Sequence, residues 1–228
     1  MRDVILFDLD NTLFDVEQYM TGAFADVAAH LEAEYGVNGE QIHADLLELW
    51  RKETSMYPHL FDDLIADHSI NADIEQIVAV FNDHEPVLEP YDGVPEVLNN
   101  LQQRGYTLGI VTDGTARRQR RKLDALGLRS AFETVVLTAE LNEPKPSPLP
   151  FEEAARRLER SGDRCVYVGD NPQVDFAGAK KVDMCTIRVR QGEFRHLPSG
   201  PHSDISIENI NEVYEAIVNA SKDHQESH

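Results

Sequence analysis

Five short apolar runs, separated by longer stretches of helical pattern, constrain the fold of this chain more than any other feature. The first is VILF at residues 4–7, and YTLGIVT, ETVVLT, CVYVG and MCTIRV follow much further along the chain. A strand that is apolar on both faces must be covered on both sides, and helices between parallel strands supply that cover. The sequence therefore predicts an α/β fold with a Rossmann-like parallel sheet of about five strands and helices on both faces.

A block of helical patterns interrupts this alternation between the first apolar run and the second. Within residues 39–53 and 71–86, apolar residues recur every three or four positions, as on one face of an amphipathic helix. No strand pattern occurs between residues 17 and 85. We therefore expect two parts: an α/β core of residues 1–14 and 88–228, and an inserted all-helical cap of residues 15–87.

The charge and the hydropathy pattern exclude several classes of partner. The chain carries a formal net charge of −20 at pH 7, which would repel the phosphates of nucleic acids and of anionic membranes. No segment approaches the roughly eighteen uninterrupted apolar residues of a membrane-spanning helix, and the first apolar run is too short for a signal peptide. We expect a soluble, cytoplasmic protein that is a monomer or a homodimer, with no nucleic acid or membrane as partner.

Polar residues follow the ends of the predicted strands. In chain order they are Asp8 and Asp10, then Thr112, Asp113 and Gly114, then Asp170. Ligands of open parallel sheets bind at the carboxyl ends of the strands, so these residues are expected to meet at one edge. Asp8 and Asp10 stand at positions i and i+2, which point the same way in a strand. Two carboxylates that close favour a cation or a proton between them.

The motifs DLDNT, VTDG, EPKP and GDNPQVD occur along the chain in this order. They resemble the motifs of the haloacid dehalogenase-like (HAD) hydrolase superfamily, in its phosphatase branch with a helical cap inserted after the first motif. Each motif alone is weak, but four in order, across residues 1 to about 215, form a strong signal. The resemblance implies a Mg²⁺-dependent phosphatase that hydrolyses a small phosphorylated metabolite through an aspartyl-phosphate.

The resemblance also implies roles for single residues. Asp8 is the expected nucleophile, and Asp10 is the expected acid that protonates the leaving oxygen and the base that activates water. The expected ligands of Mg²⁺, a cation that prefers oxygen, are Asp8, Asp170 and the main-chain carbonyl of Asp10.

The remaining expected site residues bind the phosphoryl group or support the metal. Thr112, Asp113, Gly114 and Lys145 are the expected phosphoryl-binding residues, and Thr112 and Lys145 are also expected to be catalytic. Asn171 and Asp175 are expected to support the metal from behind. In the cap, Arg51 is the expected contact with the substrate.

Alternatives to the phosphatase remain open. A phosphomutase of the β-phosphoglucomutase type would use the same residues. A non-catalytic module that binds a phosphorylated ligand could keep the fold, although the intact set of motif residues disfavours it. A dehalogenase would lack the second carboxylate, so Asp10 argues against that activity. The basic run RRQRRK at residues 117–122 is interpreted as the solvent-exposed face of a helix.

Overall fold

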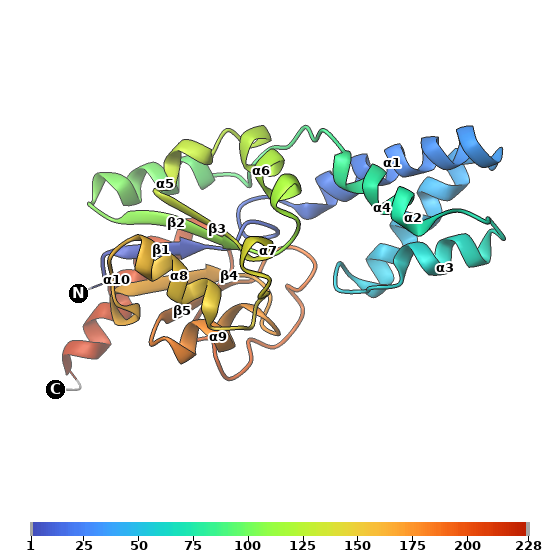
Figure 1. The fold of residues 1–228 in the computed structure, drawn as a ribbon. Coiled ribbons are helices and arrows are strands. Elements are labelled where there is room, and N and C mark those ends of the chain that lie inside the picture. The colour runs from blue at the N-terminus through green and yellow to red at the C-terminus, as the bar shows by residue number, and fades with distance from the viewer. Residues whose placement is uncertain (1, 227–228) are drawn as a thin grey trace. The chain divides into compact units, whose positions relative to one another are not determined.

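The computed structural model describes residues 2–226, and the chain divides into two compact units (Figure 1). The core unit comprises Met1–Asp15 and Glu89–His228, and the helical unit comprises Val16–Leu88. The core unit holds a parallel sheet, whereas every regular element of the helical unit is a helix. The predicted α/β fold with a helical insertion after the first strand is therefore confirmed.

The helical unit is built from amphipathic helices. Its elements are α1 Val16–Tyr35, α2 Gly39–Glu53, α3 Leu60–Asp67 and α4 Ile74–Asp83. Helix α2 begins after Asn38, whose side chain accepts a hydrogen bond from the backbone of Gln41 at 3.1 Å and so satisfies a free N–H group of the first turn. Its buried face repeats at helical spacing through Ile42, Leu46 and Trp50. Helix α1 packs against both α2 and α4, which closes a small apolar core of its own.

The sheet of the core unit has six parallel strands in the order β3-β2-β1-β4-β5-β6. The strands are β1 Val4–Phe7, β2 Thr107–Thr112, β3 Thr134–Leu137, β4 Cys165–Gly169, β5 Cys185–Val189 and β6 Ile205–Ile207. The first five are those predicted from the apolar runs. The sixth was missed because it has three residues and only Ile207 is fully buried, as suits a short edge strand.

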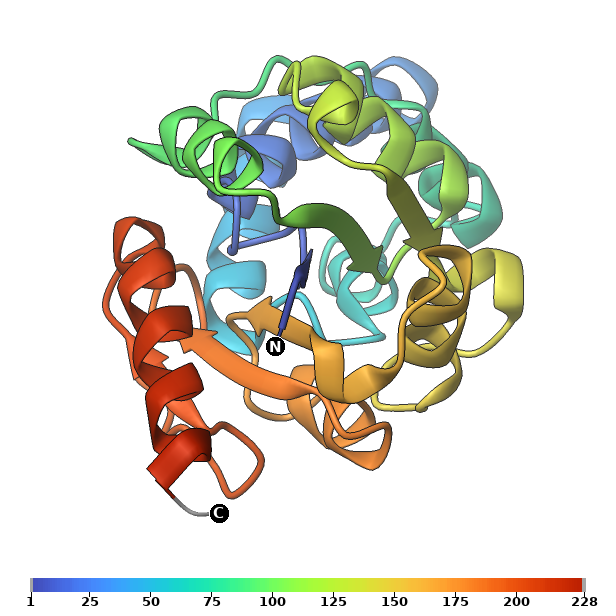
Figure 2. The ribbon, with the colours of Figure 1, turned by 90° about the vertical axis from the view of Figure 1, so that its left-hand side faces the viewer.

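Helices cover both faces of the sheet (Figure 2). They are α5 Val94–Gln103, α6 Ala116–Ala125, α7 Thr138–Leu141, α8 Leu149–Arg157, α9 Asp175–Lys181 and α10 Val213–Glu226, with short 3₁₀ turns at Arg129–Ala131, Gly162–Arg164 and Ile210–Glu212. Helices α8 and α9 lie together on one face, and α5 and α10 lie together on the other. Between the sheet and α8–α9 lies an apolar cluster that includes Leu6, Phe151 and Phe176. This packing fixes the carboxyl ends of the strands.

The register of the sheet brings three polar segments side by side. Phe7, the last residue of β1, pairs with Ile110 on β2 and with Val168 on β4, so the loops after these three strands leave the sheet at one edge. The chain continues from β1 to β2 and β3 on one side and returns to β4 on the other side. Such a reversal of strand order opens the crevice in which α/β proteins bind ligands. No helix in the described part of the chain is long and apolar enough to cross a membrane.

Candidate active site

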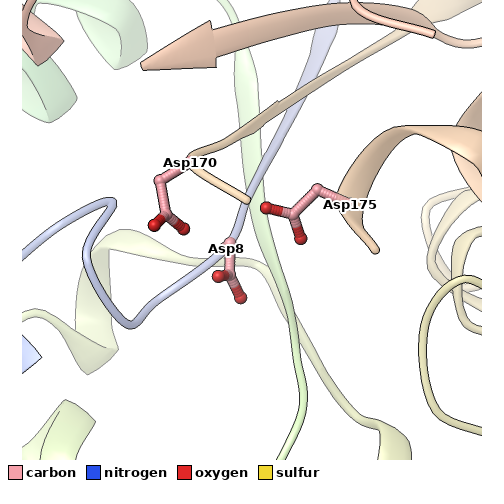
Figure 3. Close-up of side chains that lie close together, drawn as sticks. All are labelled: Asp8, Asp170 and Asp175. Atoms are coloured by element: carbon pink, nitrogen blue, oxygen red, sulfur yellow. The ribbon is translucent and has the colours of Figure 1, made fainter. Parts of the chain in front are cut away.

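Three buried aspartates meet at this edge of the sheet (Figure 3). Asp8 follows β1, Asp170 follows β4, and Asp175 begins α9. One oxygen of each carboxylate lies within 4.8 Å of one oxygen of each of the others. The backbone N–H of Asp8 donates to the carbonyl of Val168 at 2.8 Å, so the sheet ladder itself fixes the position of this residue.

Lys145 is the cation that holds this cluster together. Its Nζ lies 2.9 Å from Oδ1 of Asp8 and 2.7 Å from Oδ1 of Asp175, and its side chain is 3% exposed. The hydroxyl of Tyr167 contacts both the ammonium group of Lys145 and Oδ1 of Asp175 at 3.2 Å. Burial alone would lower the pKa of Lys145, but Asp175 and Asp8 raise it well above its ordinary value. The lysine is therefore a permanent positive charge beside Asp8.

The other oxygen of Asp175 accepts the backbone N–H of Asn171 at 2.8 Å. In return, the backbone of Asp175 donates to the carbonyl of Asn171 at 3.1 Å. Both carboxylate oxygens of Asp175 are thus engaged by groups of the chain itself, one by Lys145 and one by Asn171. This arrangement fastens the loop after β4 to Lys145.

Asp170 has a different environment. Its Oδ2 atom is buried and has no hydrogen-bond partner among the described residues. Burial raises the pKa of Asp170 well above its ordinary value, and the charges of Asp175 and Asp8 raise it further. A buried carboxylate oxygen without a donor is costly unless a proton or a cation meets it.

The cluster as a whole is short of positive charge, because it sets three carboxylates against one lysine. Burial raises the pKa of Asp8 from 3.8 to about 7, with Lys145 opposing and Asp175 and Asp10 adding to the rise. A cation between Asp8 and Asp170 would reverse these shifts and would satisfy the unpartnered oxygen of Asp170. The all-oxygen, carboxylate-rich donor set fits a hard divalent cation, so this buried group could hold a metal ion.

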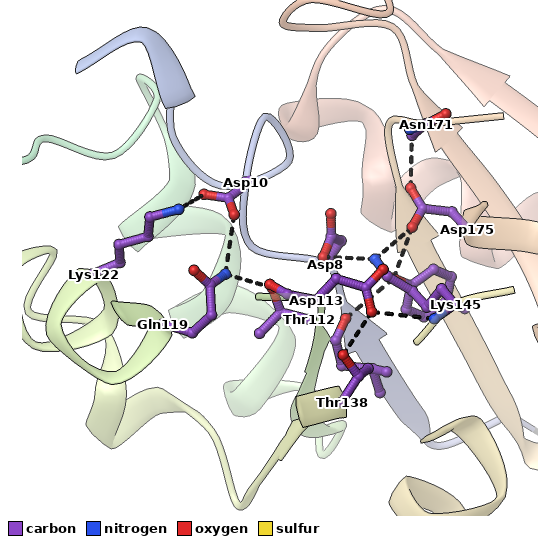
Figure 4. Close-up of polar contacts among 12 residues, drawn as sticks. Asp8, Asp10, Thr112, Asp113, Gln119, Lys122, Thr138, Lys145, Asn171 and Asp175 are labelled. Carbon is purple, nitrogen blue, oxygen red and sulfur yellow. Dashed lines mark hydrogen bonds and ion pairs between the residues drawn. The ribbon is translucent and has the colours of Figure 1, made fainter. Parts of the chain in front are cut away.

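Asp10 lies apart from this group. Strand β1 ends at Phe7, so the alternation of strand side chains does not extend to residue 10, and a turn carries Asp10 toward α6. There Lys122 Nζ donates to Oδ1 at 2.6 Å, and Gln119 Nε2 donates to Oδ2 at 3.0 Å (Figure 4). Burial alone would raise the pKa of Asp10, but the charge and hydrogen bond of Lys122 outweigh it and lower this pKa. A lysine that the sequence did not reveal therefore holds Asp10 as a carboxylate.

The interpretation of RRQRRK as a solvent-exposed face was wrong for two of its six residues. Gln119 is fully buried and Lys122 is 2% exposed. They lie at i and i+3, and Leu123 and Leu126 continue the same face at i+4 and i+7. That spacing was visible in the sequence, but the density of positive charge concealed it. The exposed positions of this helix, such as Arg117 and Arg120, do face solvent as expected.

The end of β2 and the segment after it carry three of the expected phosphoryl-binding residues. The hydroxyl of Thr112 accepts a hydrogen bond from Gln119 at 2.8 Å, so one amide joins this threonine to Asp10. The carboxylate of Asp113 instead accepts Thr138 Oγ1 at 2.7 Å and the backbone N–H of Lys145 at 3.1 Å. The side chain of Asp113 therefore positions the loop that carries Lys145. Only the main chain of Asp113 is then left to contact a ligand.

Gly114 has a φ of +112°, a left-handed conformation that favours glycine. A Cβ at this position would also lie 3.2 Å from the side chain of Gln119. The glycine thus leaves room for the amide that contacts Asp10. Helix α6 begins two residues later at Ala116, close to the start near Thr115 that the sequence predicted.

Arg51 belongs to the helical unit, where its guanidinium forms an ion pair with Glu17. More than half of its side chain is exposed, at 56%. Its contact with a substrate stays a prediction.

Comparison with known proteins gives the family. The sequence model described as haloacid dehalogenase-like hydrolase matches residues 5–189, from β1 to the end of β5. The chain belongs to the haloacid dehalogenase-like hydrolases. The match includes the helical insertion and each strand end that carries a residue of the buried cluster.

Similar proteins place this HAD hydrolase among the phosphatases. The glyceraldehyde 3-phosphate phosphatase of Methanopyrus kandleri is 32% identical over 235 residues, which cover 98% of this chain and 100% of the relative. The pyrophosphatase PpaX of Bacillus pumilus is 29% identical, over 86% of this chain and 89% of its own. Among solved structures, the HAD hydrolase YfnB of Bacillus subtilis, bound to magnesium, has the same fold, with a TM-score of 0.69 at 21% identity over 94% of this chain and 98% of its own.

Proposed function

We propose that this HAD phosphatase is Mg²⁺-dependent and hydrolyses a small phosphorylated metabolite through an aspartyl-phosphate on Asp8. The observation that carries the proposal is the buried ammonium group of Lys145 between Asp8 and Asp175, beside a carboxylate oxygen of Asp170 that lacks a partner. Phosphoryl transfer requires a nucleophile and fixed positive charge. Here the nucleophile is a carboxylate, the charge is a buried lysine, and further carboxylate oxygens could bind a metal ion.

The chain offers three groups to hold Mg²⁺: the carboxylates of Asp8 and Asp170 and the main-chain carbonyl of Asp10. When bound, the ion would neutralise the phosphate and align it with Asp8. Asp175 and Asn171 would support these ligands without binding the ion directly. The contacts of Asp175 with Lys145 and with the backbone of Asn171 already use both of its carboxylate oxygens.

In the first step, an oxygen of Asp8 forms a bond to phosphorus, and the bond from phosphorus to the leaving oxygen breaks. The leaving oxygen keeps the electron pair and takes a proton from Asp10. Asp10 is ionised in the free protein, so it acquires this proton when the anionic phosphate arrives, because a nearby negative charge raises the pKa of a carboxyl group.

Lys145 and the segment after β2 would hold the phosphoryl oxygens during this step. The ammonium group of Lys145 lies within hydrogen-bond reach of Asp8 and therefore beside the bond that forms. Thr112 would donate its hydroxyl, and the backbone N–H groups near Asp113 and Gly114 would add to the positive end of the ten-residue helix α6.

We take residues 15–87 as the cap that selects the substrate and the core of residues 1–14 and 88–228 as the catalytic domain. The core groups recognise a phosphoryl group and a metal and are indifferent to the leaving group. Recognition of the rest of the substrate must then come from elsewhere, and Arg51 is our candidate. Replacement of Arg51 by alanine should lower kcat/KM on the natural ester far more than on p-nitrophenyl phosphate; equal losses on both would exclude this role.

Glyceraldehyde 3-phosphate is the substrate to test first, because the Methanopyrus kandleri relative acts on it. Purified protein with Mg²⁺ should release inorganic phosphate from this ester, and the Asp8→Asn variant should not. A positional isomer without free phosphate would indicate a phosphomutase, and binding without turnover would indicate a phospho-ligand module. Pyrophosphate serves as the competing substrate. Faster release of phosphate from pyrophosphate than from glyceraldehyde 3-phosphate would indicate a pyrophosphatase.

A further inference from the structure

Lys122 and Gln119 form a second buried polar group on α6, outside the motifs of the family. Lys122 Nζ lies 2.6 Å from Oδ1 of Asp10, and Gln119 Nε2 lies 3.0 Å from Oδ2, so each carboxylate oxygen has its own N–H donor (Figure 4). The same Nε2 also donates to Thr112 Oγ1 at 2.8 Å. Two residues of one helix turn thereby fix the carboxylate of Asp10 in position and direction.

The burial of these two side chains has a cost that packing does not explain. An amine and an amide lose their hydration when they are buried, and this costs free energy. The exposed arginines of the same helix do not have this cost. The amide of Gln119 also points its Oε1 into a buried place where it has no partner among the described residues. Its orientation is thus set by the two oxygens that it serves, those of Asp10 and Thr112.

We infer that Lys122 and Gln119 are positioning residues for the second half of the reaction, in which the aspartyl-phosphate is hydrolysed. This inference rests on the proposed phosphatase function. Water forms a bond to phosphorus, the bond from phosphorus to Asp8 breaks with its electron pair on the Asp8 carboxylate, and a proton of the water passes to Asp10. To accept that proton, Asp10 must be a carboxylate with a lone pair aimed at the water, and the two donors restrict the rotation of the group.

A two-step reaction distinguishes this role from the alternatives. A change that slows only the second step lowers kcat and KM together and leaves kcat/KM unchanged, because kcat/KM reports the steps up to departure of the leaving group. A change that disturbs the first step lowers kcat/KM. A change that only loosens the fold lowers the melting temperature and the amount of active enzyme.

The test is the Lys122→Met variant, which keeps the length of the side chain and removes the ammonium group. p-Nitrophenolate is a weak base and leaves without a proton from Asp10, so with this substrate only the second step depends on the position of Asp10. With p-nitrophenyl phosphate and Mg²⁺, kcat should fall by about tenfold to a hundredfold and KM should fall with it, while kcat/KM changes by less than about threefold. Stopped-flow mixing should reveal a burst of about one p-nitrophenolate per enzyme, the sign that the phosphoenzyme accumulates. Lys122→Arg, which restores a charged donor, should recover part of kcat.

Arg120→Met is the matched control, because Arg120 lies on the same helix, is exposed and pairs with Glu140. It should behave as wild type. A fall in kcat/KM equal to the fall in kcat, without a burst, would overturn the inference while leaving the phosphatase function intact. Absence of turnover by the wild-type protein would instead refute the proposed function. In that event a crystal structure of Lys122→Met still decides: a carboxylate of Asp10 that keeps its place would show that Lys122 does not position it.

Discussion

Two carboxylates that stand two residues apart in the sequence lie in opposite electrostatic environments. Asp8 shares one lysine with Asp175 and lies beside Asp170. Burial raises its pKa to about 7, with Lys145 opposing the rise and the charges of Asp175 and Asp10 adding to it. Asp10 accepts hydrogen bonds from Lys122 and from the amide of Gln119, which also donates to Thr112, and its pKa is lowered. The ratio of carboxylates to lysines therefore differs between the two environments. The negative charge around Asp8 is balanced only when a further cation binds, whereas the carboxylate of Asp10 is balanced by Lys122 alone.

The largest effect should come from removing the nucleophile on the Asp8 side. Asp8→Asn should lower kcat at least about a thousandfold, because an amide does not attack phosphorus. The melting temperature should not fall, because the change removes a carboxylate whose burial is costly in its ionised form. Residual activity above that level, in protein free of wild-type contamination, would show that another group attacks phosphorus.

The second largest effect should come from metal removal, which should affect the environment of Asp8 and not that of the Asp10 carboxylate. Excess chelator should abolish turnover, and Mg²⁺ should restore it. In differential scanning calorimetry, Mg²⁺ should raise the melting temperature of the wild type by several degrees, since a ligand at a hundred times its Kd stabilises the folded state by about 2.7 kcal/mol. Asp170→Asn should lose this rise and Asp10→Asn should retain it. A rise that survives in Asp170→Asn would place the cation elsewhere.

Gln119 connects the two environments through Thr112, so its loss should have a smaller effect that reaches both steps. Gln119→Leu keeps the volume of the side chain and removes both hydrogen bonds. We expect kcat to fall by about tenfold and kcat/KM to fall as well, in contrast to Lys122→Met. If steady-state kinetics gave unchanged kcat/KM for Gln119→Leu, the link between Asp10 and the phosphoryl-binding threonine would have no catalytic consequence.

The smallest effect is a difference in the pH dependence of unfolding, measured in metal-free buffer. The folded pKa of Asp8 lies above its unfolded value, so the folded state holds the extra proton and stability falls as pH rises from about 4 to about 7. The folded pKa of Asp10 lies below its unfolded value, so its contribution is present at neutral pH and is lost on acidification through the folded pKa. At pH 8, Asp8→Asn should therefore melt above the wild type and Asp10→Asn below it. Shifts of the same sign in both variants would contradict the comparison.

The sequence predicted what depends on hydrophobic pattern. Five strands and the helical insertion follow from apolar runs and from apolar spacing, because these patterns report burial directly. The strand Ile205–Ile207 was missed because three residues at an edge, only one of them fully buried, leave too little pattern.

The site was predicted from motifs, and its charge balance was not. The motifs name Asp8, Asp10, Lys145 and Asp170, but they do not say which cation pairs with which carboxylate. Lys122 was interpreted as a solvated side chain because basic residues in helices are mostly exposed, and only its spacing relative to Leu123 and Leu126 indicated the buried face. Charges that pair across 112 positions in sequence become visible only when the sheet edge and α6 are in place.

In the proposed reaction, the phosphoryl group passes through Asp8 and not through Asp10. The most direct test is rapid acid quenching of the enzyme during turnover of glyceraldehyde 3-phosphate with Mg²⁺, followed by mass spectrometry of the peptide that contains both residues. Use of the Lys122→Met variant beside the wild type should increase the trapped fraction. We expect one phosphate on this peptide, fragment ions that place it on Asp8, and none in Asp8→Asn. Turnover with an unmodified peptide, or with phosphate on Asp10, would contradict it.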